Sequence, residues 1–450
     1  MSNQQFVVVG GGLAGLTSAV ALAEKGARVI LFEQARRLGG RAVTQQEQGY
    51  LMNLGPHALY RGGPLYNSLR SWQIAFTGKS PRLGKSSYLV ADGRKFLFPV
   101  SAAKLFLTGA LSIADKFDAA NMLKRLATQN PALLGRMDMR EWLERNVRRP
   151  RVRALGQALV RLSTYSNDMA LLSARAAIQQ VQFALKQGVL YLDGGWQTLV
   201  DGLAAKAESL GVQISSGTPV ERVECGSVRL ADGRRVDSTG TILAVPPASV
   251  EQLTGAVVGK LAPVRAAALD LGLGALPESF GTFALGVDQP IYLSMHSAVA
   301  TLAPAGKSLV LVAKYLCQGE SATRDELEDF ADLIIPGWRR NVEVARFLPN
   351  LVVSHAVMTP NGRPDVDAVP IPGVAVAGDW VGDEGMLADA AAASALRAAE
   401  FCLGKPASVP RAAAAVPAGR PSSQADAGRA APAPSPDRKS MYRPAAANKA

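Results

Sequence analysis

Residues 6–41 read FVVVGGGLAGLTSAVALAEKGARVILFEQARRLGGR, and this stretch decides the fold. The run Phe6–Val9 is continuously apolar, as expected of a strand buried on both faces of a sheet. A helical composition spans Leu16–Lys25, and Gly26 is placed to end that helix. Arg28–Phe32 then predicts a second strand. The stretch therefore predicts a strand–helix–strand unit with a parallel sheet.

Glycines and one acid occupy the turns of this unit in a spacing that suits a dinucleotide. Gly10 permits a tight turn from strand to helix, Gly12 lets the backbone approach a pyrophosphate, and Gly15 lets helix and strand pack closely. The first turn of the helix offers free N–H groups and the positive end of its dipole to phosphates. Glu33, at the end of the second strand, can accept hydrogen bonds from a ribose and would repel a 2′-phosphate. The pattern favours FAD or NAD over NADP.

Glu33 is followed by five residues and then by Gly39-Gly40-Arg41. This run resembles the E-x-x-x-x-x-G-G-R motif of the flavin amine oxidase, protoporphyrinogen oxidase and phytoene desaturase superfamily. The resemblance implies that Gly39 and Gly40 meet the FAD pyrophosphate and that Arg37 and Arg41 help to hold it. Without the resemblance, the arginines would form a solvated basic turn.

Two later segments extend the resemblance. Val374–Ala377 predicts a buried strand, and Gly378-Asp379 follows at its carboxyl end, where ligands bind in such sheets. In the resembling family this aspartate accepts hydrogen bonds from the FAD ribityl chain, and the next helix, here Asp389–Cys402, aims its N-terminus at the flavin. Val220 corresponds to a valine whose backbone reads the adenine edge. The alternative for Val220 is an ordinary core residue.

The segment Gly55-Pro56-His57 resembles a family stretch, D-x-G-x-H, that passes near the flavin ring. Asn53 stands where an aspartate is common, which alters its hydrogen bonding. His57 lies either near the flavin or among backbone carbonyls that satisfy it. The residues expected to bind the cofactor are Gly10, Gly12, Leu13, Ala14, Gly15, Glu33, Gln34, Arg37, Gly39, Gly40, Arg41, Gly55, Pro56, His57, Val220, Gly378, Asp379, Ala388 and Ala391.

Composition indicates a core-forming protein larger than one domain, with 450 residues, 48% hydrophobic and 19% charged. The three cysteines are widely spaced and form no metal motif, so a reducing compartment without disulfides is expected. Because the first residues run directly into a predicted strand, we expect no signal peptide. No apolar run reaches the roughly 20 residues of a membrane helix. We expect a cytoplasmic protein, with peripheral contact at a membrane as the alternative.

The net charge of +12 is unevenly distributed. The Ala/Pro-rich segment 405–450 carries eight basic and two acidic residues and is expected to be a disordered tail. A solvated tail with no specific partner is favoured over a tail that binds nucleic acid or anionic lipid. No specific binding of nucleic acid is therefore expected. A second basic cluster, between Arg136 and Arg153, is read as a solvated face, with a membrane surface or an anionic substrate as the alternative.

The fold class expected from these patterns is α/β, with a Rossmann-type FAD/NAD(P)-binding domain and an inserted α+β substrate domain. The FAD-binding domain is discontinuous, over 1–71, 188–248 and 353–404, and the substrate domain takes 72–187 and 249–352. The substrate domain is expected to contain a hairpin at Asp92-Gly93, helices over 102–114, 119–128, 139–147, 151–161, 174–185 and 324–333, and strands over 267–273, 282–287 and 308–315. The FAD domain is expected to add a helix over 196–210 and a small sheet over 212–214, 219–223, 228–230 and 241–244.

The resemblance implies noncovalent FAD, because no cysteine or histidine forms an attachment motif beside the C-terminal flavin segment. The chemistry expected is hydride transfer from a substrate carbon to flavin N5, with reoxidation by O2 or a quinone. The catalytic residues are unknown, with His57, Lys314 and Tyr292 as candidates; no metal site is expected.

Amine oxidases commonly carry a lysine on the strand that 267–273 would form, and this segment has none. An apolar, isoprenoid or carotenoid-like substrate of a desaturase or dehydrogenase is therefore favoured. A flavin amine oxidase that releases hydrogen peroxide is the first alternative. The second is a non-catalytic FAD-binding protein that acts through its basic tail.

Overall fold

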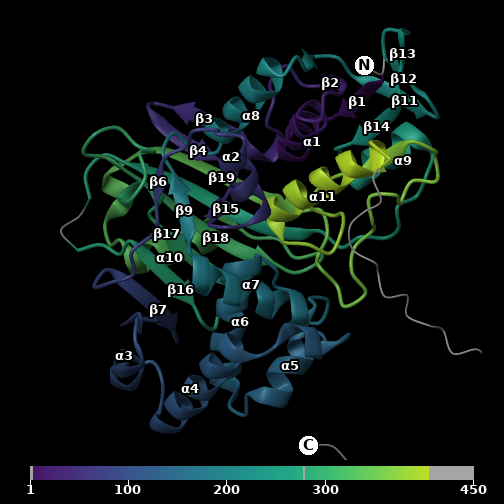
Figure 1. Cartoon of the computed structure of the whole chain (residues 1–450). Coiled ribbons are helices and arrows are strands. Elements are labelled where there is room, and N and C mark those ends of the chain that lie inside the picture. The colour runs from purple at the N-terminus through teal and green to yellow at the C-terminus, as the bar shows by residue number, and fades with distance from the viewer. Residues whose placement is uncertain (1–3, 277–278, 405–450) are drawn as a thin grey trace, which may run out of the picture. The chain divides into compact units, whose positions relative to one another are not determined.

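A five-stranded parallel sheet is built around the glycine-rich stretch (Figure 1). Its central strand β1 (Gln5–Val9) pairs on one side with β2 and on the other with β14. Val7 and Val8 are fully buried, which accounts for the uninterrupted apolar run. The strand order is β10 (Gln213–Ser216), β2 (Arg28–Glu33), β1, β14 (Gly240–Leu243) and β20 (Val374–Val376). The predicted parallel α/β architecture is confirmed.

The computed structural model describes residues 4–276 and 279–404. The described residues form one compact unit, and the predicted tail 405–450 lies outside them. Three helices accompany the parallel sheet, namely α1 (Leu13–Ala23), α8 (Gln197–Ser209) and α11 (Leu387–Cys402), and α1 packs against both of the others. The first helix begins three residues before the predicted start, because Gly12 is extended and serves as its N-cap.

The small sheet predicted over 212–244 is only partly correct. Three antiparallel strands do form it, β11 (Val220–Glu224), β12 (Ser227–Leu230) and β13 (Arg235–Asp237). The segments 212–214 and 241–244 join the parallel sheet instead, as β10 and β14. All four residues of β14 are buried, and this burial on both faces is what a central parallel strand requires.

A seven-stranded mixed sheet forms the second layer, in the order β19-β15-β18-β17-β16-β7-β8. Its predicted members are β7 (Ser87–Ala91), β8 (Arg94–Leu97), β15 (Val264–Leu273), β16 (Phe283–Gly286) and β18 (Ser308–Leu316). Two members were not predicted, β17 (Ile291–Ser294) and β19 (Val342–Ser354). The first has only four residues, and the second is an edge strand of mixed polarity, so neither has a clear two-residue period.

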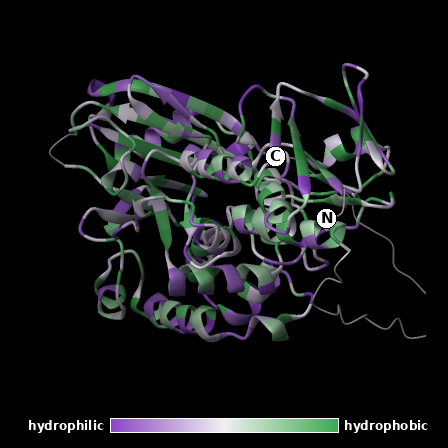
Figure 2. Cartoon of the chain, turned by 45° about the horizontal axis from the view of Figure 1, so that its top comes forward, coloured by the Kyte–Doolittle hydropathy of each residue, from purple (hydrophilic) through white to green (hydrophobic). Residues whose placement is uncertain are grey.

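Helices α3 to α7 cover one end of this second layer, at the bottom of Figure 1. They are α3 (Ala102–Leu107), α4 (Ile113–Thr128), α5 (Met139–Asn146), α6 (Pro150–Thr164) and α7 (Ala174–Gln187). Along the lower edge of Figure 2, the helices alternate hydrophobic and hydrophilic residues, as amphipathic helices do.

The single helix predicted over 102–114 is wrong. The chain leaves the helical conformation after Leu107, and α4 starts at Ile113. Ser112 and Asp115 form a capping box there, in which each side chain accepts from the other's backbone N–H. The cap creates a new helix start inside what the composition suggested was one helix.

The remaining strands and α-helices pack around the two layers. They are β3 (Thr44–Glu47), β4 (Tyr50–Asn53), β5 (Leu59–Tyr60), α2 (Pro64–Ser71), β6 (Gly78–Lys79), β9 (Val189–Leu192), α9 (Pro247–Thr254) and α10 (Arg324–Ile334). Strand β9 pairs with β5 and with β6, which brings the start of the helical insertion next to its end. Within the described part of the chain, no helix is long and apolar enough to cross a membrane.

Candidate active site

One cavity of about 750 Å³ is lined by residues of both layers. At one end it meets the carboxyl ends of the parallel strands, at Val9, Glu33 and Ala377. At the other end it reaches Phe283 of β16 and Tyr292 of β17. Its volume lies in the range of ligand-binding sites.

The turn between β1 and α1 can be built only with glycine at two positions. A Cβ at Gly10 would lie 2.4 Å from the Ala244 carbonyl oxygen, and the φ of Gly10 is +107°. A Cβ at Gly15 would lie 1.8 Å from the carbonyl oxygen of Gly10. These two glycines therefore serve the packing of helix against strand, as the spacing predicts.

Gly12, the middle glycine of the motif, has a different role, because the place of its missing side chain is open space in the cavity. Gly12 lines the cavity, and the nearest protein atom to a Cβ at Gly12 would be the Gly39 carbonyl oxygen, at 3.9 Å. The Gly39 N–H donates to the Gly11 carbonyl at 2.9 Å, so the second glycine pair lies beside the first. Gly40 also lines the cavity, with only the Gly12 Cα near its missing side chain. The two glycine segments form an open cradle of backbone.

Helix α1 points an uncapped N-terminus at this cradle. Its N-cap is Gly12, no side chain caps it, and its first turn contains no acidic residue. Leu13 and Ala14 of that turn line the cavity. Since the first N–H groups of a helix lack partners within it, they are available to a phosphate.

Glu33 closes the same corner of the cavity. Its carboxylate accepts hydrogen bonds from the N–H groups of Gly11 at 2.6 Å and Ala35 at 2.8 Å. These two bonds hold the side chain at the end of β2, beside Gln34 and facing the cavity. Each carboxylate oxygen can accept more than one hydrogen bond, so capacity for a ribose hydroxyl remains.

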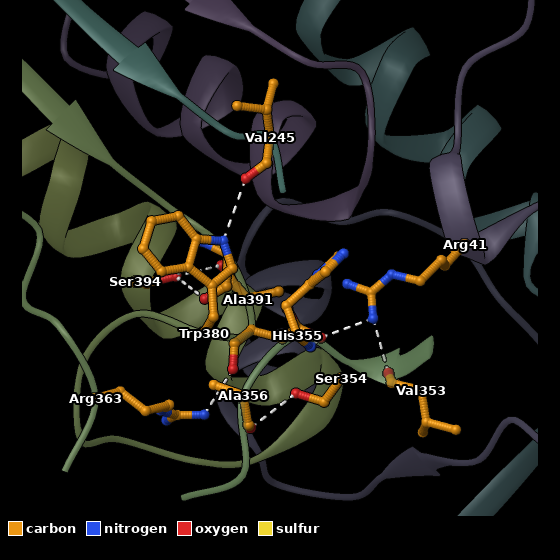
Figure 3. Close-up of polar contacts among 12 residues, drawn as sticks. Arg41, Val245, Val353, Ser354, His355, Ala356, Arg363, Trp380, Ala391 and Ser394 are labelled. Atoms are coloured by element: carbon orange, nitrogen blue, oxygen red, sulfur yellow. Dashed lines mark hydrogen bonds and ion pairs between the residues drawn. The ribbon is translucent and has the colours of Figure 1, made fainter. Parts of the chain in front are cut away.

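Arg41 and His355, both labelled in Figure 3, converge on the buried carboxylate of Asp379. Its carboxylate accepts from Arg41 Nη1 at 2.7 Å and from the backbone N–H of His355 at 3.3 Å, and it lies 3.1 Å from His355 Nδ1. Burial favours the neutral acid, but the Arg41 charge and the bonds from His355 and Arg41 outweigh it. The pKa of Asp379 therefore lies well below its usual range.

A buried arginine fixes the loop that carries Asp379. Arg363 donates to the backbone carbonyls of Asp379 and Gly382 at 2.7 Å and of Gly385 at 2.9 Å. On the other side, Ser394 of α11 accepts from the Gly378 N–H at 2.9 Å. Figure 3 shows both contacts flanking the loop between β20 and α11. The loop conformation is thus held by side chains rather than by regular secondary structure.

The N-terminus of α11 also lines the cavity, through Leu387, Ala388 and Ala391. No side chain caps this helix either. Its one early acid, Asp389, accepts instead from the backbone N–H of Leu65 in α2, at 3.1 Å. Burial, strengthened by the charge of Glu384 and opposed by that N–H, raises the pKa of Asp389 to about 7.

His57 forms part of the cavity wall between the two ends. Its ring packs on Trp196 with centroids 4.8 Å apart, and its Nδ1 lies 3.0 Å from the Gly55 carbonyl oxygen. Burial, with the charge of Arg41, lowers the pKa of His57 to about 4. His57 is therefore neutral at neutral pH and satisfies a backbone carbonyl while lining the cavity.

The far end of the cavity is a chamber of aromatic and aliphatic side chains. Tyr165 and Tyr292 face each other with their hydroxyl oxygens 3.2 Å apart, and Tyr292 stacks on Tyr315. Burial, and then the neighbouring tyrosines, raise the pKa of Tyr292 well above its usual range. Tyr165 has a φ of +60° at the C-cap of α6, a conformation that is rare for a residue other than glycine. Further aromatic and aliphatic residues that line the cavity include Leu59, Leu162, Ala184, Val189, Tyr191, Phe283 and Leu351.

Most of the predicted cofactor residues meet at this cavity. Four predicted residues do not line it: Gly15 packs under it, Arg37 donates to the Thr44 carbonyl and Gln197, and Gly55 borders a separate void of about 10 Å³. The fourth is Lys314, which forms ion pairs with Glu320 at 3.2 Å and Glu326 at 3.1 Å. The predicted residues that do line it are Gly10, Gly12, Leu13, Ala14, Glu33, Gln34, Gly39, Gly40, Arg41, Pro56, His57, Val220, Tyr292, Gly378, Asp379, Ala388 and Ala391.

Sequence patterns did not indicate His355, Arg363, Asp389 or Tyr165 as site residues. His355 directly follows β19, which was itself not predicted, and Arg363 lies in a turn with no motif. Asp389 could have been noticed as an acid in the first turn of a predicted helix, where carboxylates are favoured. For Tyr165 the sequence contains no comparable signal.

FAD fits the residues of this cavity on three observations. The open backbone cradle of Gly12 and Gly40 leaves space where side chains would otherwise stand. The uncapped start of α1 supplies N–H groups without a partner in the helix. Glu33 and Asp379, both on the cavity wall, supply carboxylates that suit sugar hydroxyls.

Solved structures share this fold at low sequence identity. An oxidoreductase from Methanosarcina mazei has a TM-score of 0.71 at 20% identity and covers 88% of this chain and 100% of its own. Putrescine oxidase, solved with putrescine, has a TM-score of 0.63 at 15% identity, over 89% of this chain and 99% of its own.

Curated relatives match shorter stretches. The carotenoid 3,4-desaturase of Haloarcula japonica is 25% identical over 262 residues, 50% of this chain and 51% of the relative. Protoporphyrinogen oxidase 2 of Arabidopsis thaliana is 28% identical over 119 residues, 26% of this chain and 23% of the relative. The chain thus spans about half, or less, of these relatives. The model of the family described as flavin containing amine oxidoreductase matches residues 13–275, more than half of the 450. The chain therefore belongs to the flavin containing amine oxidoreductase family, whose cofactor is FAD.

Proposed function

We propose that the protein is an FAD-dependent oxidoreductase that removes hydride from a carbon of an apolar substrate, as a desaturase or dehydrogenase does. One observation carries this proposal. A single cavity joins the glycine cradle, which fits a dinucleotide, to the aromatic chamber, which fits an apolar molecule. Such a continuous space lets a flavin ring and a substrate carbon meet away from water.

The chain's own groups would hold the cofactor along the cavity wall. Glu33 would accept from the ribose, the N–H groups at the start of α1 would contact the pyrophosphate beside Gly12 and Gly40, and Asp379 would accept from the ribityl chain. Val220 and Ala391 also line the cavity. Bound in this way, FAD supplies a hydride acceptor at its flavin N5.

The chamber would orient the substrate through side chains that are themselves uncharged. His57 and Tyr292 are neutral at neutral pH, given the directions of their pKa shifts. The Tyr165–Tyr292 pair makes one hydrogen bond with two hydroxyl hydrogens, so one donor remains for a substrate or a water. The surrounding aliphatic and aromatic wall favours an apolar molecule and excludes solvent.

Two observations favour an apolar substrate over an amine. No lysine is among the described residues that line the cavity, and Lys314 is held in ion pairs elsewhere. Relatives that match about half of the chain carry names of carotenoid chemistry, a carotenoid 3,4-desaturase and the 4,4′-diaponeurosporene oxygenase of Staphylococcus haemolyticus. We extend that substrate class to this chain as a proposal.

Anaerobic bleaching of the bound flavin tests this function. The FAD-loaded protein is mixed with isoprenoid polyenes in detergent and, separately, with primary amines and amino acids. We expect bleaching with polyenes alone. Bleaching by amines, with hydrogen peroxide formed once air is admitted, would instead identify an amine oxidase. Stable flavin that none of these compounds reduces would favour the non-catalytic alternative.

A further inference from the structure

Exposed apolar side chains are concentrated on one short part of the chain. Among the described residues, 14 large hydrophobic side chains are exposed, and six of them lie between Leu97 and Phe117. Within these six, the most exposed are Leu107 at 81%, Ile113 at 74% and Phe117 at 64%. These six residues, called here the docking patch, are Leu97, Val100, Phe106, Leu107, Ile113 and Phe117.

A contact between side chains connects the two helices of the docking patch. The rings of Phe106 in α3 and Phe117 in α4 meet edge to face, with centroids 5.3 Å apart. The Phe96 ring, next to Leu97 in β8, lies 3.5 Å from the position of a Cβ at Gly109, between the two helices. In Figure 1, α3 and α4 lie together at the lower end of the view. The phenylalanine pair thus joins the exposed apolar side chains of α3 and α4, and β8 lies beside the connection between these helices.

The opposite faces of these elements are anchored in the core. Leu105 of α3 and Met122 of α4 are buried in the cluster that also contains the chamber residue Tyr292. The patch is therefore not the inner face of a helix that has lost its neighbour. Its side chains point to solvent from helices that are already packed, and apolar surface of this extent on a monomer usually contacts something.

Positive charge surrounds the docking patch without acidic partners. The segment 94–128 carries six basic and two acidic residues. No salt bridge involves Lys104, Lys116 or Lys124 within the described part of the chain, and Lys116 Nζ donates to the Phe106 carbonyl at 2.8 Å. Phe117 is four positions after Ile113, and Lys124 is seven positions after Phe117. The three side chains therefore share one face of α4.

The nearby acids face arginines rather than this surface. Asp115 is paired with Arg149, whose backbone N–H also donates to Asp118 at 2.9 Å. Asp92 is paired with Arg151 at 2.8 Å. Arg149 and Arg151 therefore form ion pairs with two of these three carboxylates, and no ion pair among the described residues joins the lysines beside the patch to an acid.

We propose that the docking patch seats the protein on an anionic phospholipid surface. The leucine, isoleucine and phenylalanine side chains would enter the boundary between headgroups and acyl chains, and the lysines would meet lipid phosphates. This combination of exposed apolar residues with uncompensated cations matches an anionic bilayer, which offers both an apolar layer and negative charge.

The patch lies close to the chamber of the cavity. Phe98, directly after β8, meets Phe283 edge to face at 5.7 Å, and Phe283 lines the cavity. Leu83, which is 42% exposed, lines it as well. An apolar molecule dissolved in the bilayer would therefore have a short route to the chamber. Docking itself does not depend on the proposed reaction.

Vesicle co-sedimentation of the full-length protein tests the proposal. Vesicles of phosphatidylcholine with phosphatidylglycerol are compared with phosphatidylcholine alone, for the wild type and for Leu107→Glu and Phe117→Glu. Because both side chains are exposed, neither change disturbs the core, and thermal unfolding checks this. Val257→Glu is the matched control, since Val257 is 71% exposed and follows α9, away from α3 and α4 in Figure 1.

We expect the wild type to bind the anionic vesicles, more weakly at high salt, and each patch variant to lose roughly tenfold in partition. The double variant Lys104→Glu/Lys124→Glu should bind the anionic vesicles more weakly, with no change in binding to phosphatidylcholine alone. Val257→Glu should match the wild type. A wild type that stays in the supernatant would overturn the proposal, and so would patch variants that still sediment. Binding that is lost only on replacing Arg438, Lys439 and Arg443 by serine would overturn it too, by placing the contact on the tail.

Discussion

Arg41 and Asp379 are 338 positions apart in the chain and are joined by a hydrogen bond of 2.7 Å. The arginine follows the second glycine pair, and the aspartate follows the last strand of the parallel sheet. Their contact ties the first and last segments of the cofactor-binding layer across the cavity. His355, from the end of β19, adds the seven-stranded sheet to the same junction.

Asp379→Asn should weaken FAD binding. The change keeps the shape of the side chain but removes the negative charge that Arg41 and His355 surround. We expect a roughly tenfold or larger loss of affinity, since hydrogen bonds to charged groups are worth about 1.5–3 kcal/mol. Titration of the apoprotein with FAD, followed by fluorescence quenching, measures it. Asp365→Asn is the matched control, because its ion pair with Arg397 lies outside the cavity lining; equal losses in both variants would contradict this role for Asp379.

Two glycines of the first motif should respond differently to alanine. Gly12→Ala should leave the unfolding temperature near that of the wild type, because the backbone is extended there and the new methyl enters the cavity. Its FAD affinity should fall by about tenfold or more, since the methyl occupies the cradle. Gly15→Ala should instead destabilise the fold by about 3 kcal/mol, through the clash with the Gly10 carbonyl.

Calorimetry and flavin titration separate these two effects. Gly84→Ala is the control, because no atom lies within 4 Å of its missing side chain and its φ is not positive. A Gly12→Ala protein that keeps full flavin affinity would show that the cradle does not hold the cofactor.

The strand–helix–strand unit of β1, α1 and β2 was predictable because its strands and turns each have a local physical signature, whereas β10 and β14 were assigned to the wrong sheet. An apolar run, a glycine spacing and an acid at a strand end suffice to locate Phe6–Val9, Gly12 and Glu33. The domain division proposed for the chain follows the same logic and remains a proposal. By contrast, β19 contains Arg346 and Pro349 and alternates poorly, so its residues, His355 included, were not connected to the site.

The chamber was less predictable because its members meet only through tertiary contacts. Tyr165 ends α6 and Tyr292 belongs to a four-residue strand, and their hydroxyls meet across 127 positions of sequence. Tyr292 was named as a candidate only because it is a polar group of the predicted substrate domain, and Lys314 because it lies in an apolar strand. Hydrophobic periodicity cannot distinguish a side chain facing the cavity from one facing Glu320 and Glu326 on the surface.

Lys314→Ala and Tyr292→Phe should therefore differ in their effect on turnover. The lysine is held in ion pairs outside the cavity lining, so its loss should leave flavin reduction unchanged. Tyr292→Phe removes one hydroxyl of the chamber pair and should change the apparent affinity for substrate more than the rate of flavin reduction. Stopped-flow reduction at several substrate concentrations measures both quantities. Slow reduction in Lys314→Ala would reverse this assignment.

Asp389 should make stability depend on pH. Its pKa is raised from 3.8 to about 7, so the folded state holds a proton that the unfolded chain releases. Stability contributed by this proton is complete below about pH 4 and is lost as pH rises to about 7. Asp389→Asn cannot titrate, and its amide oxygen can still accept from Leu65. The difference in unfolding temperature between pH 5 and pH 8 should be smaller in this variant than in the wild type; an unchanged difference would refute the shift.

The most direct test of the account is the absorption spectrum of the purified protein, before and after heat denaturation. We predict two flavin bands, with the yellow colour released into the supernatant as FAD when the protein precipitates. That result would establish that the cavity holds FAD noncovalently. A colourless protein that also fails to take up added FAD would contradict the assignment of the glycine cradle, Glu33 and Asp379 to the cofactor.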